Sequence, residues 1–453
     1  MDELRKLAYF VCGFKLENAP EEVVRAARFC VLDTVGSALG AARFEEIPAL
    51  SAELSLWTAS DSPRSAAVWG QRKRMDVFAA LLVNGMLSHA LELDDVHTGS
   101  KSHIGAVVVP AAWTMAEALG LPGKSFLEAV IVGYETMARI GAAMDVTSNR
   151  KRGWHTTGII GTFGAAAAAS FLLKLDEQRT LYALGMAGTQ SSGLWAFLAE
   201  GSTCKKLHTA RAAVNGVSAA ILAKAGMTGP ERILDAVDGG LYSAVSDSFD
   251  MTRVCADLGI VYQIMNIDKK PYPCCRSTHH AIDAALAIRK SKNFSVGLID
   301  SILIRTYEVA LLQCGSTLYP RNAVEAKFSV AYTCAVALIY GKVTLEEFGP
   351  KSLDDPSVRA LSERIRVIED GEFTSRYPSR WGCELEVIYK DGKKSHQRVD
   401  DMSGSVKVPL SERQELDKFT SLANSAFNDP LFVRETASNI LRVEKLEQLP
   451  DLV

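Results

Sequence analysis

One long uncharged segment constrains the fold of this chain more than any other feature. No charged residue occurs from Thr156 to Leu173, and five consecutive alanines follow Gly164 within it. The segment is rich in Gly, Ala and Thr and strongly apolar only at its end, so we predict a buried helix rather than one that crosses a bilayer. Small side chains let helix axes approach closely, and this helix is therefore expected inside a tightly packed helical core.

The rest of the first 265 residues also has the pattern of helices. From Glu21 to Ala42 the apolar residues recur at close to 3.6-residue intervals, and Pro20 stands at the entrance, where its missing N–H costs nothing. The same pattern predicts further helices over 77–93, 107–119, 126–144, 159–173, 181–197 and 210–225.

The pattern changes after about residue 265. Residues 301–307 alternate in polarity as a strand does, and 384–389 and 394–399 flank Asp391-Gly392, a strong hairpin signal. Helices are expected over 324–340, 411–424 and 430–443. The sequence therefore predicts a mainly α protein, with a large helical domain (1–265 plus 401–453) and a smaller inserted α+β lid domain (266–400).

Composition excludes several classes of function. The 453 residues are 48% hydrophobic and carry a net charge of −3, so no basic surplus favours nucleic acid or an anionic membrane surface. The N-terminus does not read as a secretory signal, and the nine cysteines include no CxxC pair. We therefore expect a cytoplasmic protein with reduced thiols that binds neither nucleic acid nor membrane.

Six of the eight histidines fall in four short polar motifs. The first motif runs from Glu92 through Asp94-Asp95 and His97 to His103, where a long apolar stretch ends. It could be a solvated loop with a capping aspartate. A metal site is the other alternative, but the motif contains no HExxH or other recognised ligand spacing, so we predict no metal.

The other three motifs lie further along the chain. His155 precedes the uncharged segment and could be structural, and Lys205-Lys206-Leu207-His208 could be an exposed basic turn. The fourth motif runs from Lys270 to His280, where two prolines favour extended chain and a helix is expected to begin near Ser277 or Thr278. Together the four motifs supply imidazoles for proton transfer and cations for a polyanionic substrate.

In this order and at these separations, the four motifs resemble the MmgE/PrpD family, which includes 2-methylcitrate dehydratase, cis-aconitate decarboxylase and iminodisuccinate epimerase. The resemblance covers essentially the whole chain and includes Ala212-Ala213-Val214-Asn215-Gly216 after the third motif. It implies a helical domain with a smaller lid domain, a homodimer, an active site between the domains and no required cofactor. The implied activity is that of a lyase acting on a small polycarboxylate.

The resemblance also implies that four residues of this chain line the active site, His103, His155, Lys205 and Lys270, and we predict these to be catalytic. From the four motifs we further predict eight substrate-binding residues, Glu92, Asp94, Asp95, His97, His208, Cys275, Arg276 and His279. The chain departs from the family pattern at three positions: Val96 replaces a threonine that is common after the aspartate pair, and Cys275 and Cys314 stand where the animal decarboxylase has a histidine and a tyrosine. Dehydration, decarboxylation, epimerisation of a dicarboxylate and catalytically silent carboxylate binding therefore stay open. The two lysines, in segments interpreted as turns, are expected to act on substrate binding rather than on folding.

Overall fold

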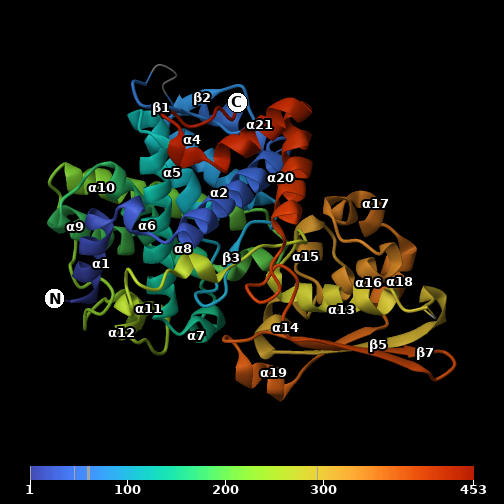
Figure 1. Cartoon of the computed structure of the whole chain (residues 1–453). Coiled ribbons are helices and arrows are strands. Elements are labelled where there is room, and N and C mark those ends of the chain that lie inside the picture. The colour runs from blue at the N-terminus through green and yellow to red at the C-terminus, as the bar shows by residue number, and fades with distance from the viewer. Residues whose placement is uncertain (1, 45, 59–61, 293) are drawn as a thin grey trace. The chain divides into compact units, whose positions relative to one another are not determined.

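The computed structural model describes residues 2–44, 46–58, 62–292 and 294–453. It is mainly helical, with a small mixed sheet in the C-terminal region, which confirms the predicted fold class. The chain divides into two compact units (Figure 1). Unit 1 comprises Met1–Trp195, Cys204–Asp268 and Ser411–Val453, and unit 2 comprises Ala196–Thr203 and Lys269–Leu410.

The uncharged segment forms α8 (Thr156–Leu172) at the centre of unit 1. Every side chain from Thr156 to Ser170 is buried, as predicted. Small residues bring the neighbouring helix close, since a Cβ added at Gly216 would lie 2.3 Å from the Thr162 carbonyl oxygen. Among the described residues, no helix has both the length and the apolarity needed to cross a bilayer. The helices around α8 are α5 (Gly105–Leu119), α6 (Gly123–Ala142), α9 (Glu177–Gly188) and α10 (Lys205–Lys224).

A second close approach joins α10 to α4 (Val77–Ala90). A Cβ at Gly85 would lie only 2.7 Å from the Cα of Ala210, so these two helices touch almost backbone to backbone. Asp76 begins α4 by accepting hydrogen bonds from the N–H groups of Phe78 and Ala79. The C-terminal helices α20 (Glu412–Phe427) and α21 (Pro430–Ile440) return to pack on α2 (Glu21–Ala41), as Figure 1 shows.

Unit 1 contains two short antiparallel pairs that the sequence pattern did not predict. Strand β1 (Ser65–Ala67) pairs with β2 (Arg74–Asp76), and β3 (Val96–His97) pairs with β4 (Ile267–Asp268). Strands of two or three residues are too short for alternation to be visible in the sequence. The remaining helices of unit 1 are α1 (Glu3–Gly13), α3 (Glu46–Leu54), α7 (Val146–Lys151), α11 (Leu241–Val245) and α12 (Thr252–Cys255).

Unit 2 is built on a four-stranded sheet with the order β6-β5-β7-β8. Strand β5 (Ile299–Thr306) runs parallel to β6 (Ile365–Glu369) and antiparallel to β7 (Cys383–Tyr389), which forms the predicted hairpin with β8 (Lys394–Val399). Helix α13 (His279–Arg289) packs on β7 and β8 and against α16 (Val330–Tyr340) (Figure 1). Shorter helices complete the unit: α14 (Glu308–Cys314), α15 (Ala323–Lys327), α17 (Pro350–Leu353), α18 (Pro356–Ser362) and α19 (Gly371–Arg376).

Three predicted helix boundaries are wrong. Helix α9 ends at Gly188 rather than near residue 197, and Gly193 soon adopts a left-handed φ of +117°. The helix predicted over 324–340 is two helices, because Ser329 accepts a hydrogen bond from the Tyr332 N–H and caps a new helix. Helix α10 begins at Lys205, five residues before the predicted start.

Candidate active site

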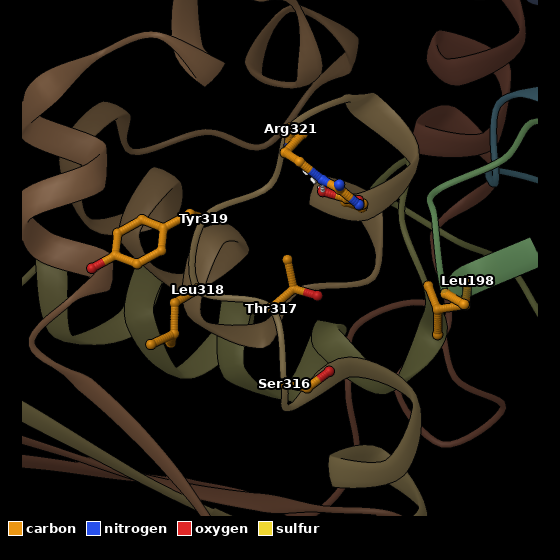
Figure 2. A pocket seen from close by; sticks show the side chains of 8 residues that line it. Leu198, Ser316, Thr317, Leu318, Tyr319 and Arg321 are labelled. Atoms are coloured by element: carbon orange, nitrogen blue, oxygen red, sulfur yellow. Dashed lines mark hydrogen bonds and ion pairs between the residues drawn. The ribbon is translucent and has the colours of Figure 1, made fainter.

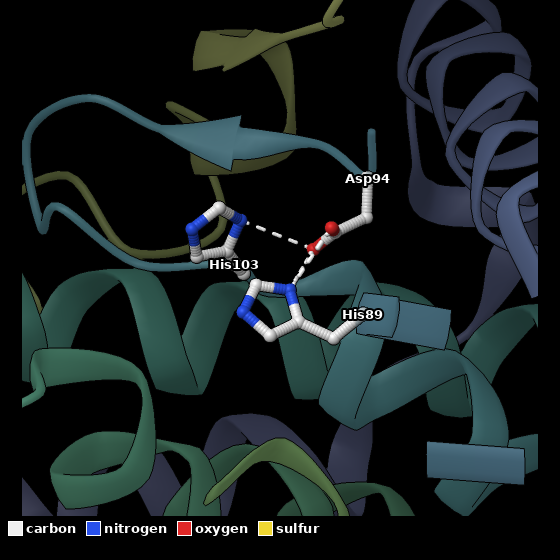
Figure 3. A group of neighbouring side chains, drawn as sticks. All are labelled: His89, Asp94 and His103. Atoms are coloured by element: carbon white, nitrogen blue, oxygen red, sulfur yellow. Dashed lines mark hydrogen bonds and ion pairs between the residues drawn. The ribbon is translucent and has the colours of Figure 1, made fainter. Parts of the chain in front are cut away.

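Three side chains of unit 1 form a hydrogen-bonded cluster, shown in Figure 3. His89 lies in the last turn of α4, and Asp94 and His103 lie in the loops on either side of β3. The Nδ1 atom of His89 is 2.9 Å from both carboxylate oxygens of Asp94, and the Nδ1 atom of His103 is 3.0 Å from Oδ2. The Asp94 carboxylate therefore lies between two imidazoles.

These contacts fix where the imidazole protons are. The Nδ1 atom of His103 also lies 3.0 Å from the carbonyl oxygen of Asp95, and both of its partners can only accept hydrogen bonds. Nδ1 of His103, like Nδ1 of His89, must therefore carry the hydrogen. A neutral ring then has its basic lone pair on Nε2, the arrangement that a general base requires.

Asp94 remains ionised although it is completely buried. Burial alone would raise the pKa of this carboxyl, but His89 and His103 outweigh it and hold the pKa well below its usual range. A buried carboxylate of this kind stabilises the imidazolium that forms when His103 accepts a proton. The side chain of His103 keeps 12% of its surface exposed, whereas those of His89 and Asp94 keep none.

A buried ion pair lies beside this cluster. Lys205, the first residue of α10, forms a short ion pair with Glu92, whose Oε1 is also 3.4 Å from Nε2 of His89. Glu92 adopts a left-handed φ of +57°, a conformation that persists in a residue with a Cβ only when its surroundings hold it. The interpretation of Lys205 as part of a turn is wrong, because it lies in a helix with 6% of its surface exposed. Its partner Glu92 gives Lys205 a role in folding as well.

His155 and His208 form a second imidazole pair in unit 1. Their Nδ1 atoms are 3.0 Å apart, so one ring donates to the other. Burial, Lys205 and the neighbouring histidines lower the pKa of His155 well below its usual value, and burial and Lys205 lower that of His208 to about 4. Both rings are neutral near pH 7. The ring centroids of His155 and His103 are 6.5 Å apart, which places two potential acid/base groups close together.

Asp95 and His97 have partners typical of structural residues. Asp95 is fully buried and accepts hydrogen bonds from the Gly105 N–H at 2.9 Å and the Tyr134 hydroxyl at 2.6 Å. The Nδ1 atom of His97 accepts from the Ser100 N–H at 3.1 Å, so its tautomer is opposite to that of His103. These contacts shape the loop that presents His103.

The remaining predicted site residues lie in unit 2. Lys270 is fully buried, and Arg276 donates to Nδ1 of His279 at 3.0 Å. Cys275 is buried, and the side-chain amide of Gln313 lies 3.7 Å from its Sγ. The fourth motif thus holds two cations inside unit 2. Its helix begins at His279, and Thr278 donates to the Cys275 carbonyl rather than capping that helix.

Val96 and Cys314, the other two positions at which the chain departs from the family pattern, are also buried. Val96 lies in β3 opposite Asp268, and Cys314 ends α14. Each cysteine of the chain lies in the described part and is a free thiol there.

The group His89, Asp94 and His103 has donor atoms that a metal ion could bind. These atoms lie within 4.8 Å of one another, and two imidazoles with a carboxylate suit zinc or ferrous iron. Both Nδ1 atoms already donate to Asp94, however, and a metal ion bound at these two nitrogens would have to displace both Nδ1 protons. The metal-independent site stays a prediction.

Two hollows in the structure lie apart from this chemistry. One, of about 550 Å³ in unit 2, is lined by the loop from Ser316 to Tyr319 and by Arg321, which points at Glu325 (Figure 2). The other, of about 590 Å³ in unit 1, is lined by aromatic residues such as Phe10 and Tyr262. Among the described residues that line them, neither hollow includes a predicted site residue. The side-chain chemistry, rather than the size of a hollow, therefore identifies the candidate site.

Sequence reasoning missed His89. This residue stands within an apolar stretch, Met86-Leu87-Ser88-His89-Ala90-Leu91, and its partner Asp94 follows only after the helix has ended. The spacing of five residues matches neither a helix face nor a known ligand motif. A polar side chain at the end of an apolar helix, directly before an acidic run, was the one available signal.

Comparison with known proteins assigns the chain to a family. The MmgE/PrpD N-terminal domain matches residues 5–253, and the MmgE/PrpD C-terminal domain matches residues 272–438. The chain belongs to the MmgE/PrpD family.

Relatives in this family carry the names of two lyase activities. The chain is 28% identical to a cis-aconitate decarboxylase-like protein, oryM, of Aspergillus oryzae, over 99% of this chain and 96% of that protein. It is 27% identical to cis-aconitate decarboxylase of Mus musculus, over 98% and 90%. It is 24% identical to 2-methylcitrate dehydratase of Salmonella typhimurium, over 81% and 79%. Family members are thus lyases that act on small polycarboxylates, and the suspected family is confirmed.

Proposed function

We propose that this chain is a cofactor-independent lyase that removes carbon dioxide or water from a small polycarboxylate. The observation that carries the proposal is the Asp94 carboxylate, which holds the Nδ1 protons of His89 and His103 and so leaves a basic Nε2 on His103. Decarboxylation is placed first because relatives named for it align with 97–99% of this chain.

The chemistry follows from proton transfer next to a carboxylate. In a dehydration, Nε2 of His103 takes a proton from the carbon beside a carboxylate, and the hydroxyl group leaves with a proton from an acid. In a decarboxylation, the electron pair of the C–CO2 bond stays on carbon, which an imidazolium then protonates. Either path passes through enolate-like charge, and the Lys205 ammonium would stabilise it.

Each of the proposed groups has a distinct role in this scheme. His103 is the proposed acid/base, and Asp94 stabilises its imidazolium form. His155 is the second acid/base, kept neutral by burial and by Lys205. Lys270 and Arg276, in unit 2, are proposed to bind substrate carboxylates, for which ammonium and guanidinium are the fitting partners.

A second candidate function is epimerisation of a dicarboxylate. The imidazoles of His103 and His155 lie with centroids 6.5 Å apart, and an epimerase needs two acid/base groups and no leaving group. The two functions differ in their products. A lyase releases an alkene product with water or CO2, whereas an epimerase changes optical rotation without either.

The test is to incubate the protein with a panel of polycarboxylates that includes cis-aconitate and 2-methylcitrate. Alkene formation or CO2 release is followed, together with optical rotation for dicarboxylates. On the substrate found, we expect His103→Ala and His155→Ala each to lower kcat by about 10²–10⁴-fold, as loss of an acid/base group should. If both variants keep near-normal rates, the proposed site is wrong, and if no polycarboxylate reacts, the enzyme assignment fails.

A further inference from the structure

One turn of unit 2 contacts the cationic segment, residues 269–276, which carries the two side chains proposed to bind substrate, Lys270 and Arg276. The turn consists of Ser403 and Gly404 and follows β8. The Ser403 carbonyl accepts a hydrogen bond from Nη1 of Arg276 at 3.0 Å, and the Gly404 carbonyl accepts from the Lys269 N–H at 2.7 Å. The position of this turn therefore determines where Arg276 and the backbone next to Lys270 lie.

The turn itself is held by Asp283, a residue of α13. The Ser403 N–H donates to Oδ2 of Asp283 at 2.7 Å. The other oxygen, Oδ1, accepts from the Tyr272 hydroxyl at 2.6 Å. Because Tyr272 lies between Lys270 and Arg276 in the chain, one carboxylate joins the cationic segment, α13 and the turn.

The turn has little freedom to adapt. Gly404 adopts a left-handed φ of +76°, and a Cβ at this position would lie 1.8 Å from the Lys269 carbonyl oxygen. The backbone of the turn is thus packed directly on the backbone of the cationic segment. If the Asp283 hydrogen bond is lost and the turn moves, the cationic segment is expected to move with it, because the two backbones are in direct contact.

The nitrogen of Arg276 that donates to Ser403 also donates to His279. Nε2 of His279 is 3.3 Å from the Cys274 carbonyl oxygen, which can only accept, so the ring hydrogen is on Nε2 and Nδ1 accepts from Arg276. Burial, Arg276 and Lys270 lower the pKa of His279 well below its usual value, and the ring is neutral. His279 therefore orients the guanidinium group and does not compete with it for an anion.

We propose that Asp283 is a positioning residue that sets the affinity of unit 2 for substrate carboxylates by holding the Ser403-Gly404 turn against Arg276 and the Lys270 segment. The proposal rests on the proposed function, since Arg276 and Lys270 are its carboxylate-binding cations. Asp283 acts through these residues and does not itself bind the anion, which its own negative charge would repel.

The experiment compares Asp283→Ala with Asp283→Asn in the full-length protein. We measure KM, kcat and melting temperature on the substrate found, and calorimetric binding of tricarballylate and succinate. Asp283→Ala should raise KM and weaken tricarballylate binding about 10- to 100-fold, with kcat changed by less than about threefold. Asp283→Asn should stay within about fivefold of wild type, since its amide oxygen can accept from Ser403 and its nitrogen can donate to Tyr272.

A matched control exists on the same unit. Asp355 also joins a tyrosine hydroxyl to a backbone N–H, accepting from Tyr340 at 2.5 Å and from the Ser357 N–H at 2.7 Å. Asp355→Ala should lower the melting temperature without changing tricarballylate affinity. An equal loss of affinity in this variant would attribute the effect to general loosening and overturn the proposal.

Three further outcomes are decisive. Wild-type affinity in folded Asp283→Ala would overturn the positioning role. If that variant does not fold, Tyr272→Phe removes one of the two hydrogen bonds and should raise KM severalfold, so unchanged KM there would also overturn it. If the wild type neither binds nor turns over any polycarboxylate, the proposed function itself fails.

Discussion

Replacing Asp94 by asparagine tests the central feature of the candidate site. The carboxylate accepts hydrogen bonds from two imidazole Nδ1 atoms, at 2.9 Å from His89 and 3.0 Å from His103. An asparagine has one acceptor oxygen and one donor nitrogen in their place. It can accept from one ring only, and the other ring must move its hydrogen to Nε2, which removes the lone pair that a base needs there.

The size of the effect follows from these contacts. A hydrogen bond to a charged group contributes about 1.5–3 kcal/mol, and the substitution removes one of the two such bonds. At 1.36 kcal/mol for each factor of ten, this loss alone should lower kcat by about 10- to 100-fold. Loss of the charge adds in the same direction, because the His103 imidazolium loses its counter-ion.

The assay measures kcat and melting temperature of Asp94→Asn on the substrate found by the polycarboxylate panel. Glu128→Gln is the matched control, since Glu128 is a buried carboxylate of unit 1 that accepts from the Leu16 N–H instead. It should keep kcat while changing stability. A folded Asp94→Asn enzyme with kcat within tenfold of wild type would refute the assignment of Asp94 as the group that sets the histidine tautomers.

Three further predictions follow from the same structure. Lys205→Met should lower kcat/KM about 10- to 100-fold and lower the melting temperature, because it removes the ammonium partner of the buried Glu92 carboxylate; adding Glu92→Gln should restore stability but not activity, and restored activity would contradict the role in catalysis. Activity should survive exhaustive treatment with a chelator, since the Nδ1 atoms of His89 and His103 are already hydrogen-bonded to Asp94; activity that is lost on metal removal and regained on its return would show the contrary. Burial lowers the pKa of His97 from 6.5 to about 4, so the folded protein binds fewer protons than the unfolded chain and stability falls as pH drops below 6.5. This residue should cost about 2 kcal/mol of unfolding free energy at about pH 5, measured by urea unfolding, and His97→Asn should remove that loss; an equal pH dependence in both proteins would contradict the burial argument.

Local patterns in the sequence predicted most of the long helices and the β7–β8 hairpin. The central helix α8 was visible because eighteen residues without charge can be placed only in a core, and the β7–β8 hairpin because Asp391-Gly392 suits a tight turn. Both features are determined by residues that are close together in the chain. Contacts between residues far apart in the chain could not be predicted from such local patterns.

Lys205 and Lys206 illustrate what the sequence could not reveal. Two adjacent lysines after a glycine resemble a surface turn, yet both are buried at the start of α10. Their partners are Glu92 and Glu46, more than a hundred residues earlier in the chain. Nothing in a single sequence marks such pairs. His89 was missed for a related reason, because its partner Asp94 lies beyond the end of the helix that carries it.

The contact between Gly85 and Ala210 changes how variants of this protein should be interpreted. A methyl group at Gly85 would lie 2.7 Å from the Ala210 Cα, so α4 and α10 would have to separate or slide. Glu92 follows the end of α4 and Lys205 begins α10, and the displacement would reach their ion pair. In an activity screen, Gly85→Ala would then be grouped with substitutions of catalytic residues, although it removes no functional group. Libraries that seek new substrates should therefore leave the contact between α4 and α10 unchanged.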